Sequence, residues 1–298
     1  MISEKILLGN NENVYLSTYI LNILMKNQKR PAVIVCPGGA YLSTSKKEGE
    51  PVALEFNARG YHAFVLNYST LDSAPDNCKF PQQLLELATC VKIIRENADK
   101  WGVDVDKLSI IGFSAGANLA ANYGVYWDKG LLDSVTTNRE LLKPNALLLS
   151  YPILDYALNE DKLVASSENE VIYIDNFKVD KNLRIDMMKQ SNKHFLGVEE
   201  LTLEQQKMVS PYYHVTKDTP ATFIWHTFED KLVNVQQSLA YARKLSEFNV
   251  PCELHVYETG HHGLSLANET TAQYENEINK NVSTWFNLAV NWLDKRMK

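Results

Sequence analysis

Long hydrophobic runs are missing from this sequence of 298 residues. The most apolar early stretch, Val14 to Met25, is interrupted by polar side chains and is too short to cross a bilayer, so it indicates a strand. The N-terminal segment is charged at Glu4 and Lys5 and lacks the apolar core of a secretory signal. We therefore expect no membrane partner and a cytoplasmic location.

Blocks of like charge are also missing. The chain has 30 Lys and Arg residues against 36 Asp and Glu residues, which gives a formal net charge of −6. A mildly acidic chain without a basic cluster argues against nucleic acid or an anionic membrane surface as its main partner.

Cysteine is scarce and its spacing is irregular. The four cysteines, Cys36, Cys78, Cys90 and Cys252, show no C-x-x-C spacing, and two of them lie in apolar runs. Buried, reduced thiols are therefore expected rather than disulfides or metal ligands. Nothing in the sequence calls for a metal or an organic cofactor. The oligomeric state stays open, with a homo-oligomer among the alternatives.

Short β-rich segments alternate with helical patterns along most of the chain. This alternation predicts an α/β fold, a mostly parallel sheet with helices on both of its faces. The expected strands are residues 5–8, 14–25, 31–36, 62–67, 108–112, 146–151, 222–226 and 253–257. The expected helices are residues 50–59, 81–101, 116–127, 235–248 and 275–296.

One interval interrupts this alternation. More than sixty residues, from Asp155 to about Pro220, separate two strands that should be neighbours, and a loop of this length is usually functional or forms small helices. We expect residues 156–219 to form a cap-like insertion after the sixth strand, within a single domain of residues 1–298. Its aromatic side chains either line a substrate pocket or pack the insertion onto the body: Tyr156, Tyr173, Phe177, Phe195, Tyr212 and Tyr213.

A G-x-S-x-G motif, Gly112 to Gly116, lies directly after an expected strand and directly before an expected helix. In such a turn the central serine adopts a strained backbone conformation, and glycines at both ends avoid steric collisions. The following helix directs its free N–H groups and its positive dipole end towards the same point, which favours the anion formed when the serine attacks a carbonyl. Ser114 is therefore the predicted nucleophile.

A second glycine cluster, Cys36 to Tyr41, follows the strand expected at residues 31–36. Small residues there allow backbone N–H groups to approach an oxyanion, which is the task of the H-G-G-G segment in lipases and esterases. Pro-Gly-Gly alone is a common turn. Its occurrence about 75 residues before the serine motif makes an oxyanion hole the preferred interpretation.

With these motifs in place, the chain resembles the α/β-hydrolase fold esterases of the acetyl-esterase and hormone-sensitive-lipase-like group, often described as sugar-ester or xylan-ester hydrolases. The resemblance extends through nearly the whole chain, in the segments 35–41, 48–53, 111–116 and 222–227. Two positions depart from the lipase pattern: Pro37 stands where histidine is usual, and Ala40 stands where the third glycine is usual.

The resemblance implies an α/β-hydrolase fold and an oxyanion hole in the second glycine cluster. By the family pattern, the donors are the amides of Gly39 and Ala40, with Gly38 third, joined by the amide of Ala115. Tyr41, the next residue of the loop, is the expected substrate contact.

The catalytic base is expected late in the chain, because this fold has the order serine, acid, histidine. His261 and His262 lie in a glycine-flanked loop after the last expected strand. The family places its histidine immediately before a glycine, which favours His262. His226, at a strand end, is expected to be an ordinary buried histidine, with a supporting role as the alternative.

The acid that orients the base is expected in the loop after residues 222–226, which contains Glu229 and Asp230. The family pattern of an aspartate followed by a hydrophobic residue and a turn favours Asp230. Asp155, after the preceding strand, is the second candidate.

These residues predict a serine carboxylesterase acting on a small-molecule ester of short acyl chain, with acetylated sugars or oligosaccharides as the expected substrates. The alternatives are a serine peptidase or amidase on the same fold, or a noncatalytic binding protein. Fold analogy alone does not choose among them.

Overall fold

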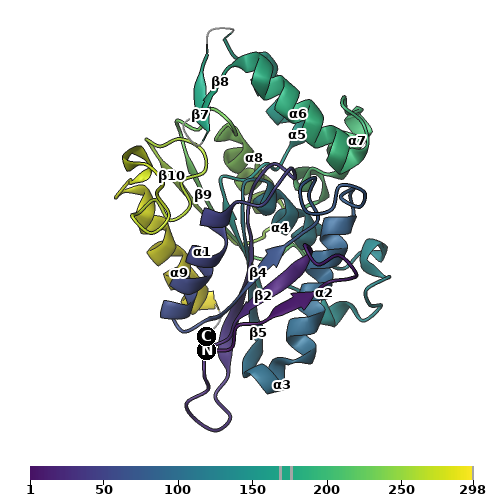
Figure 1. Ribbon diagram of the computed structural model, residues 1–298, viewed down its shortest axis with the longest axis vertical. Helices are drawn as coiled ribbons and strands as arrows, with labels where there is room; N and C mark the ends of the chain where they lie inside the picture. Colours follow the sequence, from purple (N-terminus) through teal and green to yellow (C-terminus); the bar gives the residue numbers. More distant parts are fainter. Residues whose placement is uncertain (168–169, 175–176, 297–298) are drawn as a thin grey trace.

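One sheet of eight strands crosses the middle of the part of the chain that the computed structural model describes, residues 1–167, 170–174 and 177–296 (Figure 1). The strand order is β1-β2-β4-β3-β5-β6-β9-β10. The first two strands are antiparallel to their neighbours, and every later pair is parallel. The strands are β1 (Lys5–Leu7), β2 (Tyr15–Tyr19), β3 (Arg30–Cys36), β4 (His62–Asn67), β5 (Val103–Phe113), β6 (Ala146–Ser150), β9 (Thr222–Thr227) and β10 (Cys252–Tyr257). The predicted mostly parallel sheet is confirmed.

Helices cover both faces of this sheet, as predicted. On one face lie α1 (Glu50–Ala58) and α9 (Trp285–Arg296), and on the other lie α2 (Gln82–Glu96), α3 (Ala98–Trp101), α4 (Ala115–Tyr126) and α8 (Gln236–Glu247). Short 3-10 turns occur at Lys46–Glu48, Gly130–Leu132, Arg139–Leu141, Pro211–His214, Glu275–Glu277 and Val282–Thr284.

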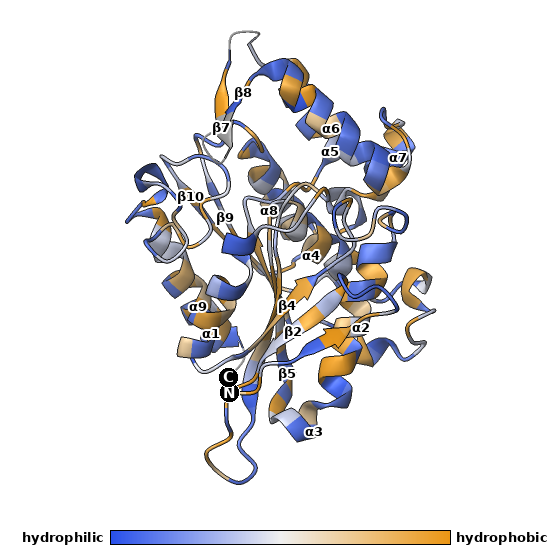
Figure 2. Cartoon of the chain, viewed as in Figure 1, coloured by the Kyte–Doolittle hydropathy of each residue, from blue (hydrophilic) through white to orange (hydrophobic). Residues whose placement is uncertain are grey.

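Two hydrophobic cores, one on each face, follow from the alternation of side chains along the strands. In β3, Ile34 and Cys36 belong to the core under α2 and α4, while Val33 and Val35 belong to the core under α1 and α9. Because both faces are buried, the strand is a continuous apolar run instead of an alternating one. Figure 2 shows hydrophobic residues concentrated in the central strands and on parts of the flanking helices.

The C-terminal helix begins ten residues later than predicted, at Trp285 instead of residue 275. Asparagine side chains hold the preceding segment in turns: Asn268 accepts from the Thr270 amide, and Asn279 accepts from the amides of Asn281 and Val282. Such local side-chain bonds compete with helix formation.

Three further boundaries differ from the prediction. The helix expected at 81–101 is divided at Asn97, whose side chain donates to the Ile93 carbonyl oxygen. β5 starts at Val103, which pairs with Arg30 of β3, and the mostly polar residues 104–107 form an irregularity before the regular pairing resumes at Leu108. β2 ends at Tyr19, after which the buried Ile20 forms an isolated bridge to Ile2 and the chain from Asn22 to Asn27 is exposed.

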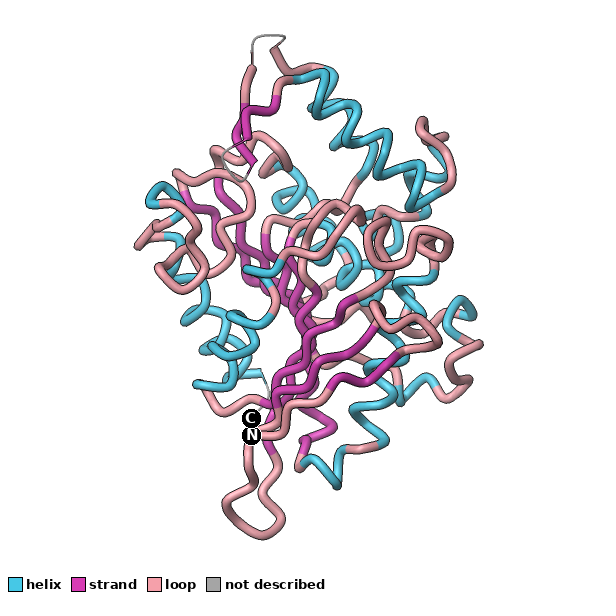
Figure 3. The backbone as a smooth tube through the Cα atoms, viewed as in Figure 1, coloured by secondary structure: helices cyan, strands magenta, loops and turns pink. Residues whose placement is uncertain are grey.

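The segment between β6 and β9 contains small elements of its own, as expected for so long an interval. They are α5 (Tyr156–Val164), β7 (Ile172–Ile174), β8 (Phe177–Val179), α6 (Lys181–Leu196) and α7 (Leu203–Met208). In Figure 3 the segment forms a separate group beyond one end of the sheet. The side chains of Tyr173 and Phe177, two of the aromatics expected in a pocket, lie outside the described residues.

Candidate active site

Ser114 lies in the sharp turn between β5 and α4 with a backbone conformation of φ 51° and ψ −116°. The flanking glycines explain how the chain reaches it. A Cβ atom at Gly112 would collide with the backbone of Gly116, and one at Gly116 would collide with the carbonyl oxygen of Cys36. The G-x-S-x-G pattern is therefore required by close backbone packing, and the strained serine is held at the carboxyl end of the sheet.

Ser114, His262 and Asp230 form one hydrogen-bonded line, which joins three loops at the carboxyl ends of β5, β9 and β10. Ser114 Oγ lies 2.8 Å from His262 Nε2, and His262 Nδ1 lies 2.6 Å from Asp230 Oδ2. A carboxylate only accepts, so Nδ1 carries the hydrogen and Nε2 is free to accept the serine hydroxyl. The structure brings all three predicted residues together in the geometry that a serine nucleophile and its base require.

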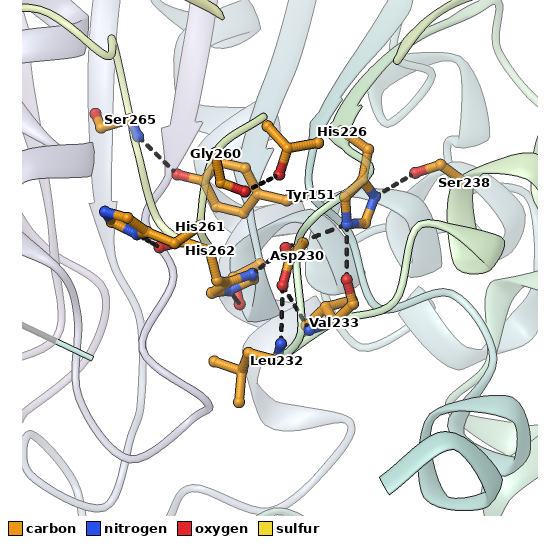
Figure 4. A network of polar contacts seen from close by, with 12 residues as sticks. Tyr151, His226, Asp230, Leu232, Val233, Ser238, Gly260, His261, His262 and Ser265 are labelled. Atoms are coloured by element: carbon orange, nitrogen blue, oxygen red, sulfur yellow. Dashed lines mark hydrogen bonds and ion pairs between the residues drawn. The ribbon is translucent and has the colours of Figure 1, made fainter. Parts of the chain in front are cut away.

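Asp230 is fully buried at its side chain and is surrounded by donors (Figure 4). Its Oδ1 accepts the amides of Leu232 and Val233, both at 2.9 Å, and its Oδ2 contacts His226 and His262. Burial raises the pKa of Asp230, but the charge of His262 and the hydrogen bonds from both histidines outweigh burial and hold this pKa well below its ordinary value. Asp230 is therefore a stable carboxylate.

Opposing influences act on the pKa of His262. Burial lowers its pKa, while the charge and hydrogen bond of Asp230, together with the charge of Glu48, raise it, and the net effect is a pKa above the ordinary 6.5. The ring of Tyr151 packs edge-on against the imidazole with centroids 4.9 Å apart. The imidazole of His262 is thus fixed in place from two sides, by Asp230 and by Tyr151.

The second glycine cluster lies against the nucleophile turn. A Cβ atom at Gly38 would be 3.0 Å from Ser114 Cβ, and Gly39, Ala40 and Tyr41 all have positive φ, at 128°, 55° and 59°. Among the described residues, the amides of Gly39, Ala40 and Ala115 have no hydrogen-bond acceptor. These are the amides expected to form the oxyanion hole.

Gly38, which we expected as a third donor, has its amide engaged elsewhere. Its N–H donates to Glu48 Oε2 at 2.8 Å. It is therefore not free to bind an oxyanion in this arrangement.

Comparison with known proteins identifies the family. A family model described as BD-FAE matches residues 20–245. The chain belongs to the BD-FAE family. It is 32% identical to endo-1,4-beta-xylanase B of Butyrivibrio fibrisolvens over 245 residues. This match covers 81% of the present chain and 33% of the xylanase. The chain spans between about a third and a half of the length of the curated relatives that it matches.

Solved structures similar to this BD-FAE member confirm the expected α/β-hydrolase fold. The acetyl ester-xyloside bifunctional hydrolase of Caldicellulosiruptor lactoaceticus has a TM-score of 0.74 and 29% identity, with 98% of this chain and 96% of that chain covered. The carboxylesterase Cest-2923 of Lactobacillus plantarum has a TM-score of 0.78 with 99% and 98% covered, and at 24% identity this likeness concerns the fold alone. The predicted membership of an esterase family of hydrolases is confirmed.

In this BD-FAE member, Tyr41, the expected substrate contact, lines the cavity beside Ser114. Its side chain is buried, its hydroxyl donates to Asn118 Oδ1 at 2.7 Å, and its ring stacks on Phe195 at 3.9 Å. Phe195 comes from α6. Tyr41 and Phe195 thus attach the inserted segment to the loop of residues 37–41, which we call the oxyanion loop. Phe195 therefore has the packing role that is one of the two expected for the aromatics of the insertion.

A cavity of about 110 Å³ opens at Ser114 between the body and the inserted segment. Ala40, Ser114 and Ala115 contribute from the body. The inserted segment contributes both apolar and polar residues: Tyr156, Leu163, Met187, Met188 and Leu201, together with Asn159, Glu160, Arg184, Ser191 and Asn192. Of the remaining predicted aromatics, Tyr212 and Tyr213 pack against each other.

The other sequence candidates have structural roles instead of places in the triad. Asp155 caps the N-terminus of α5 by accepting the amides of Ala157 and Leu158. Glu229 accepts the amide of Gly260 at 3.1 Å, and His261 Nδ1 contacts the carbonyl oxygen of His262 at 2.8 Å.

Two residues near the site were missed by sequence reasoning, Glu48 and Tyr151. Glu48 belongs to the segment 48–53 on which the family resemblance depends, yet nothing local indicates that its carboxyl is buried. Tyr151 has a positive φ of 39° directly after β6. Their positions relative to the triad depend on contacts between distant parts of the chain.

Membrane-spanning helices, metal-binding clusters and disulfides do not occur among the described residues. No described helix is long and apolar enough to cross a membrane. No cluster of three or more metal-binding side chains occurs in residues 1–167, 170–174 and 177–296. All four cysteines are free; Cys36, Cys78 and Cys90 are buried as expected, while Cys252 is partly exposed.

Proposed function

We propose that this chain is a serine carboxylesterase that hydrolyses short acyl esters through an acyl-enzyme on Ser114. The observation that carries the proposal is the hydrogen-bonded line from Ser114 through His262 to Asp230, next to loop amides that have no acceptor among the described residues. A noncatalytic relative has no need for a strained serine paired with an oriented base.

The first half of the reaction forms the acyl-enzyme. Ser114 Oγ attacks the ester carbonyl carbon while His262 Nε2 takes the hydroxyl proton, and Asp230 stabilises the imidazolium that results. As the bond to the alcohol oxygen breaks, His262 returns its proton to that oxygen. Water then attacks the acyl group by the same steps, which releases the acid and restores the Ser114 hydroxyl.

The negative charge of the tetrahedral intermediate falls on the former carbonyl oxygen. The amides of Gly39, Ala40 and Ala115 are its donors in this proposal, because they lack other acceptors among the described residues. Preorganised amides of this kind cost no reorganisation during the reaction. Glycine adopts the positive φ of Gly39 without strain, whereas the positive φ of Ala40 is backbone strain that accompanies this arrangement.

The acyl group fits the cavity beside Ser114. Its volume of about 110 Å³ is well below the roughly 300 Å³ at which pockets for drug-sized ligands begin. Its apolar lining from Leu163, Met187 and Met188 suits a short hydrocarbon chain. Acetyl to butyryl groups are therefore the proposed acyl range.

The alcohol leaves on the side of His262, since that residue must protonate it. A depression there is lined by the polar side chains of Glu229, Lys231, His261 and His262 and by the apolar residues Val171, Ile172 and Leu232, of which Leu232 also lines the acyl cavity. The polar side chains can form hydrogen bonds with hydroxyl groups of the alcohol. Together with relatives named as a xylanase and an acetyl ester-xyloside hydrolase, this depression supports acetylated sugars or oligosaccharides as substrates.

Covalent labelling combined with matched substrates tests this proposal. A fluorophosphonate should modify Ser114 alone, as read by peptide mass spectrometry. The enzyme should release acetate from acetylated xylo-oligosaccharides and cleave p-nitrophenyl acetate much faster than the matched amide p-nitroacetanilide. Labelling at another serine would contradict the nucleophile, and faster cleavage of the amide would favour a peptidase or amidase.

A further inference from the structure

Glu48 is a buried carboxyl group beside the candidate site that the serine mechanism does not use. It lies at the end of the short 3-10 turn before α1, and its exposed fraction is 3%. A buried carboxylate is costly unless hydrogen bonds compensate for its loss of water. Its contacts therefore indicate what it does.

Both oxygens of Glu48 accept hydrogen bonds from groups next to the site. The Gly38 amide donates to Oε2 at 2.8 Å, and the Tyr151 hydroxyl donates to Oε1 at 2.5 Å. The direction of the second bond follows from Ser265, whose amide already donates to the Tyr151 oxygen at 3.1 Å. Burial raises the pKa of Glu48 above its ordinary value, against the lowering effect of its hydrogen bonds from Tyr151 and Gly38 and of the charges of His262 and Lys47. Because both hydrogen-bond partners are donors, these contacts satisfy the ionised form of Glu48.

These two bonds connect the oxyanion loop to the histidine loop. Gly38 directly precedes Gly39 and Ala40, whose amides are the proposed oxyanion donors. Tyr151 packs its ring against His262 and binds Ser265 in the loop that follows this histidine. Glu48 thus fixes the position of the oxyanion donors relative to the base, although it contacts neither directly.

The charge of Glu48 also acts on His262, whose protonated form it favours. Several other groups face the same imidazole. Asp230 favours its protonated form and Lys47 opposes it. Tyr151 packs against it, and the depression at its outer side is lined by Glu229, Lys231 and His261.

We propose that Glu48 is a positioning residue, which anchors the oxyanion loop through Gly38 and holds the His262 ring through Tyr151 while adding a second negative charge behind the base. This inference rests on the proposed serine mechanism. It assigns to Glu48 and Tyr151 a part in that mechanism that no motif in the sequence indicates.

Two substitutions at Glu48 separate anchoring from charge. Glu48→Ala removes both, so its kcat for p-nitrophenyl acetate should fall about 10- to 100-fold, approaching the loss of one oxyanion donor, with KM changed less than about threefold. Glu48→Gln retains an acceptor for the Gly38 amide and should have a kcat at least about fivefold above that of Glu48→Ala. In both variants the acid limb of kcat/KM should move to lower pH, because the loss of a nearby negative charge makes His262 harder to protonate.

Glu86 provides the matched control. It is another buried glutamate at 3% exposure, and it accepts the Ser69 amide at 2.8 Å without contacting any triad residue in the described part of the chain. Glu86→Gln should leave the acid limb where it is in the wild type. An acid limb that is unmoved in both Glu48 variants, or a kcat of Glu48→Ala within about threefold of wild type, would overturn the proposal.

Tyr151→Phe tests the same network if the Glu48 variants do not fold. Without the phenol hydroxyl, the Glu48 carboxylate loses a hydrogen-bond donor and its ionised form is less stabilised. The acid limb of kcat/KM should therefore move to lower pH, as in the Glu48 variants, but by a smaller amount. An acid limb that does not move in Tyr151→Phe counts against the proposal.

Fluorophosphonate labelling of each variant tests the serine mechanism separately. If Ser114 is labelled but the Glu48 and Tyr151 variants behave as wild type, only the positioning role of Glu48 is contradicted. If Ser114 of the wild-type protein is not labelled, the serine mechanism itself is contradicted.

Discussion

His226 Nε2 lies 3.2 Å from Asp230 Oδ2 while it donates to the Val233 carbonyl oxygen at 2.8 Å. A carbonyl oxygen only accepts, so the hydrogen of His226 is on Nε2, and Nδ1 accepts the Ser238 hydroxyl at 2.8 Å. We expected an ordinary buried histidine here. It is buried, and it also contributes a donor to the carboxylate that orients the base.

Asp230→Asn tests whether this carboxylate is the acid of the triad. An amide in its place cannot favour the required tautomer of His262 or stabilise the imidazolium, so kcat should fall by about 10⁴. Asp155→Asn is the matched control, because Asp155 caps α5 and asparagine is an equally good cap. A loss of similar size in both variants would leave the acid unassigned.

Ser114→Ala should fold normally and lose about 10⁴ to 10⁶ in kcat. The triad acts as a unit, while the oxyanion amides and substrate binding leave a residual rate. Far-ultraviolet circular dichroism checks the fold, and initial rates on p-nitrophenyl acetate measure the loss. Retention of more than about a tenth of the wild-type activity would be incompatible with Ser114 as the nucleophile.

His262→Ala and His261→Ala should differ by at least about a hundredfold in kcat/KM. Only His262 lies between Ser114 and Asp230, while His261 contacts a backbone carbonyl oxygen. Steady-state measurement of kcat/KM for both variants on the same ester tests which histidine is the base. Equal losses would mean that the base is not His262 alone.

The acid limb of kcat/KM should have its midpoint above the ordinary histidine pKa of about 6.5. The protonated ring cannot accept the serine proton, so activity is lost as pH falls through the pKa of His262, which Asp230 and Glu48 raise against the opposing effect of burial. Below the midpoint, kcat/KM should fall about tenfold per pH unit. A profile that is flat from about pH 5 to 8 would contradict histidine as the base.

Acyl-chain preference should follow the size of the cavity beside Ser114. We expect kcat/KM to be highest for acetyl to butyryl p-nitrophenyl esters and to fall at least about tenfold at octanoyl, without activation at an oil-water interface. Longer chains gain only about 0.8 kcal/mol for each buried methylene, and the charged residues of the inserted segment keep its apolar runs short.

Met187→Ala extends this test, because Met187 lines the cavity and its truncation enlarges it. The variant should shift the preference towards longer acyl chains. Leu203→Ala is the control, since Leu203 is an exposed residue of α7 outside the cavity lining. A wild-type preference for decanoyl over acetyl esters, measured below the micelle concentration, would place the protein with the lipases.

Much of the fold follows from local patterns. The apolar runs of β3 and β4 and the amphipathic spacing of α2 indicate strands and helices within a few residues, because each depends on neighbours close in sequence. The predicted boundaries were wrong where an asparagine side chain competes with helix formation, as at Asn97 and Asn279. They were also wrong in β5, where the irregular, mostly polar residues 104–107 separate Val103 from the regularly paired part of the strand.

The sequence by itself determined the sharp turn at Ser114, the proposed nucleophile, because that turn needs Gly112 and Gly116 and these glycines therefore mark it. For the other two residues of the proposed triad the sequence indicated two short loops, and the family resemblance favoured His262 over His261 and Asp230 over Glu229. Only the tertiary structure decided that Gly38 is engaged, that His226 contacts Asp230, and that Glu48 meets Tyr151 across 103 residues. Such contacts depend on the packing of distant strands and loops against one another, and no short segment carries that information.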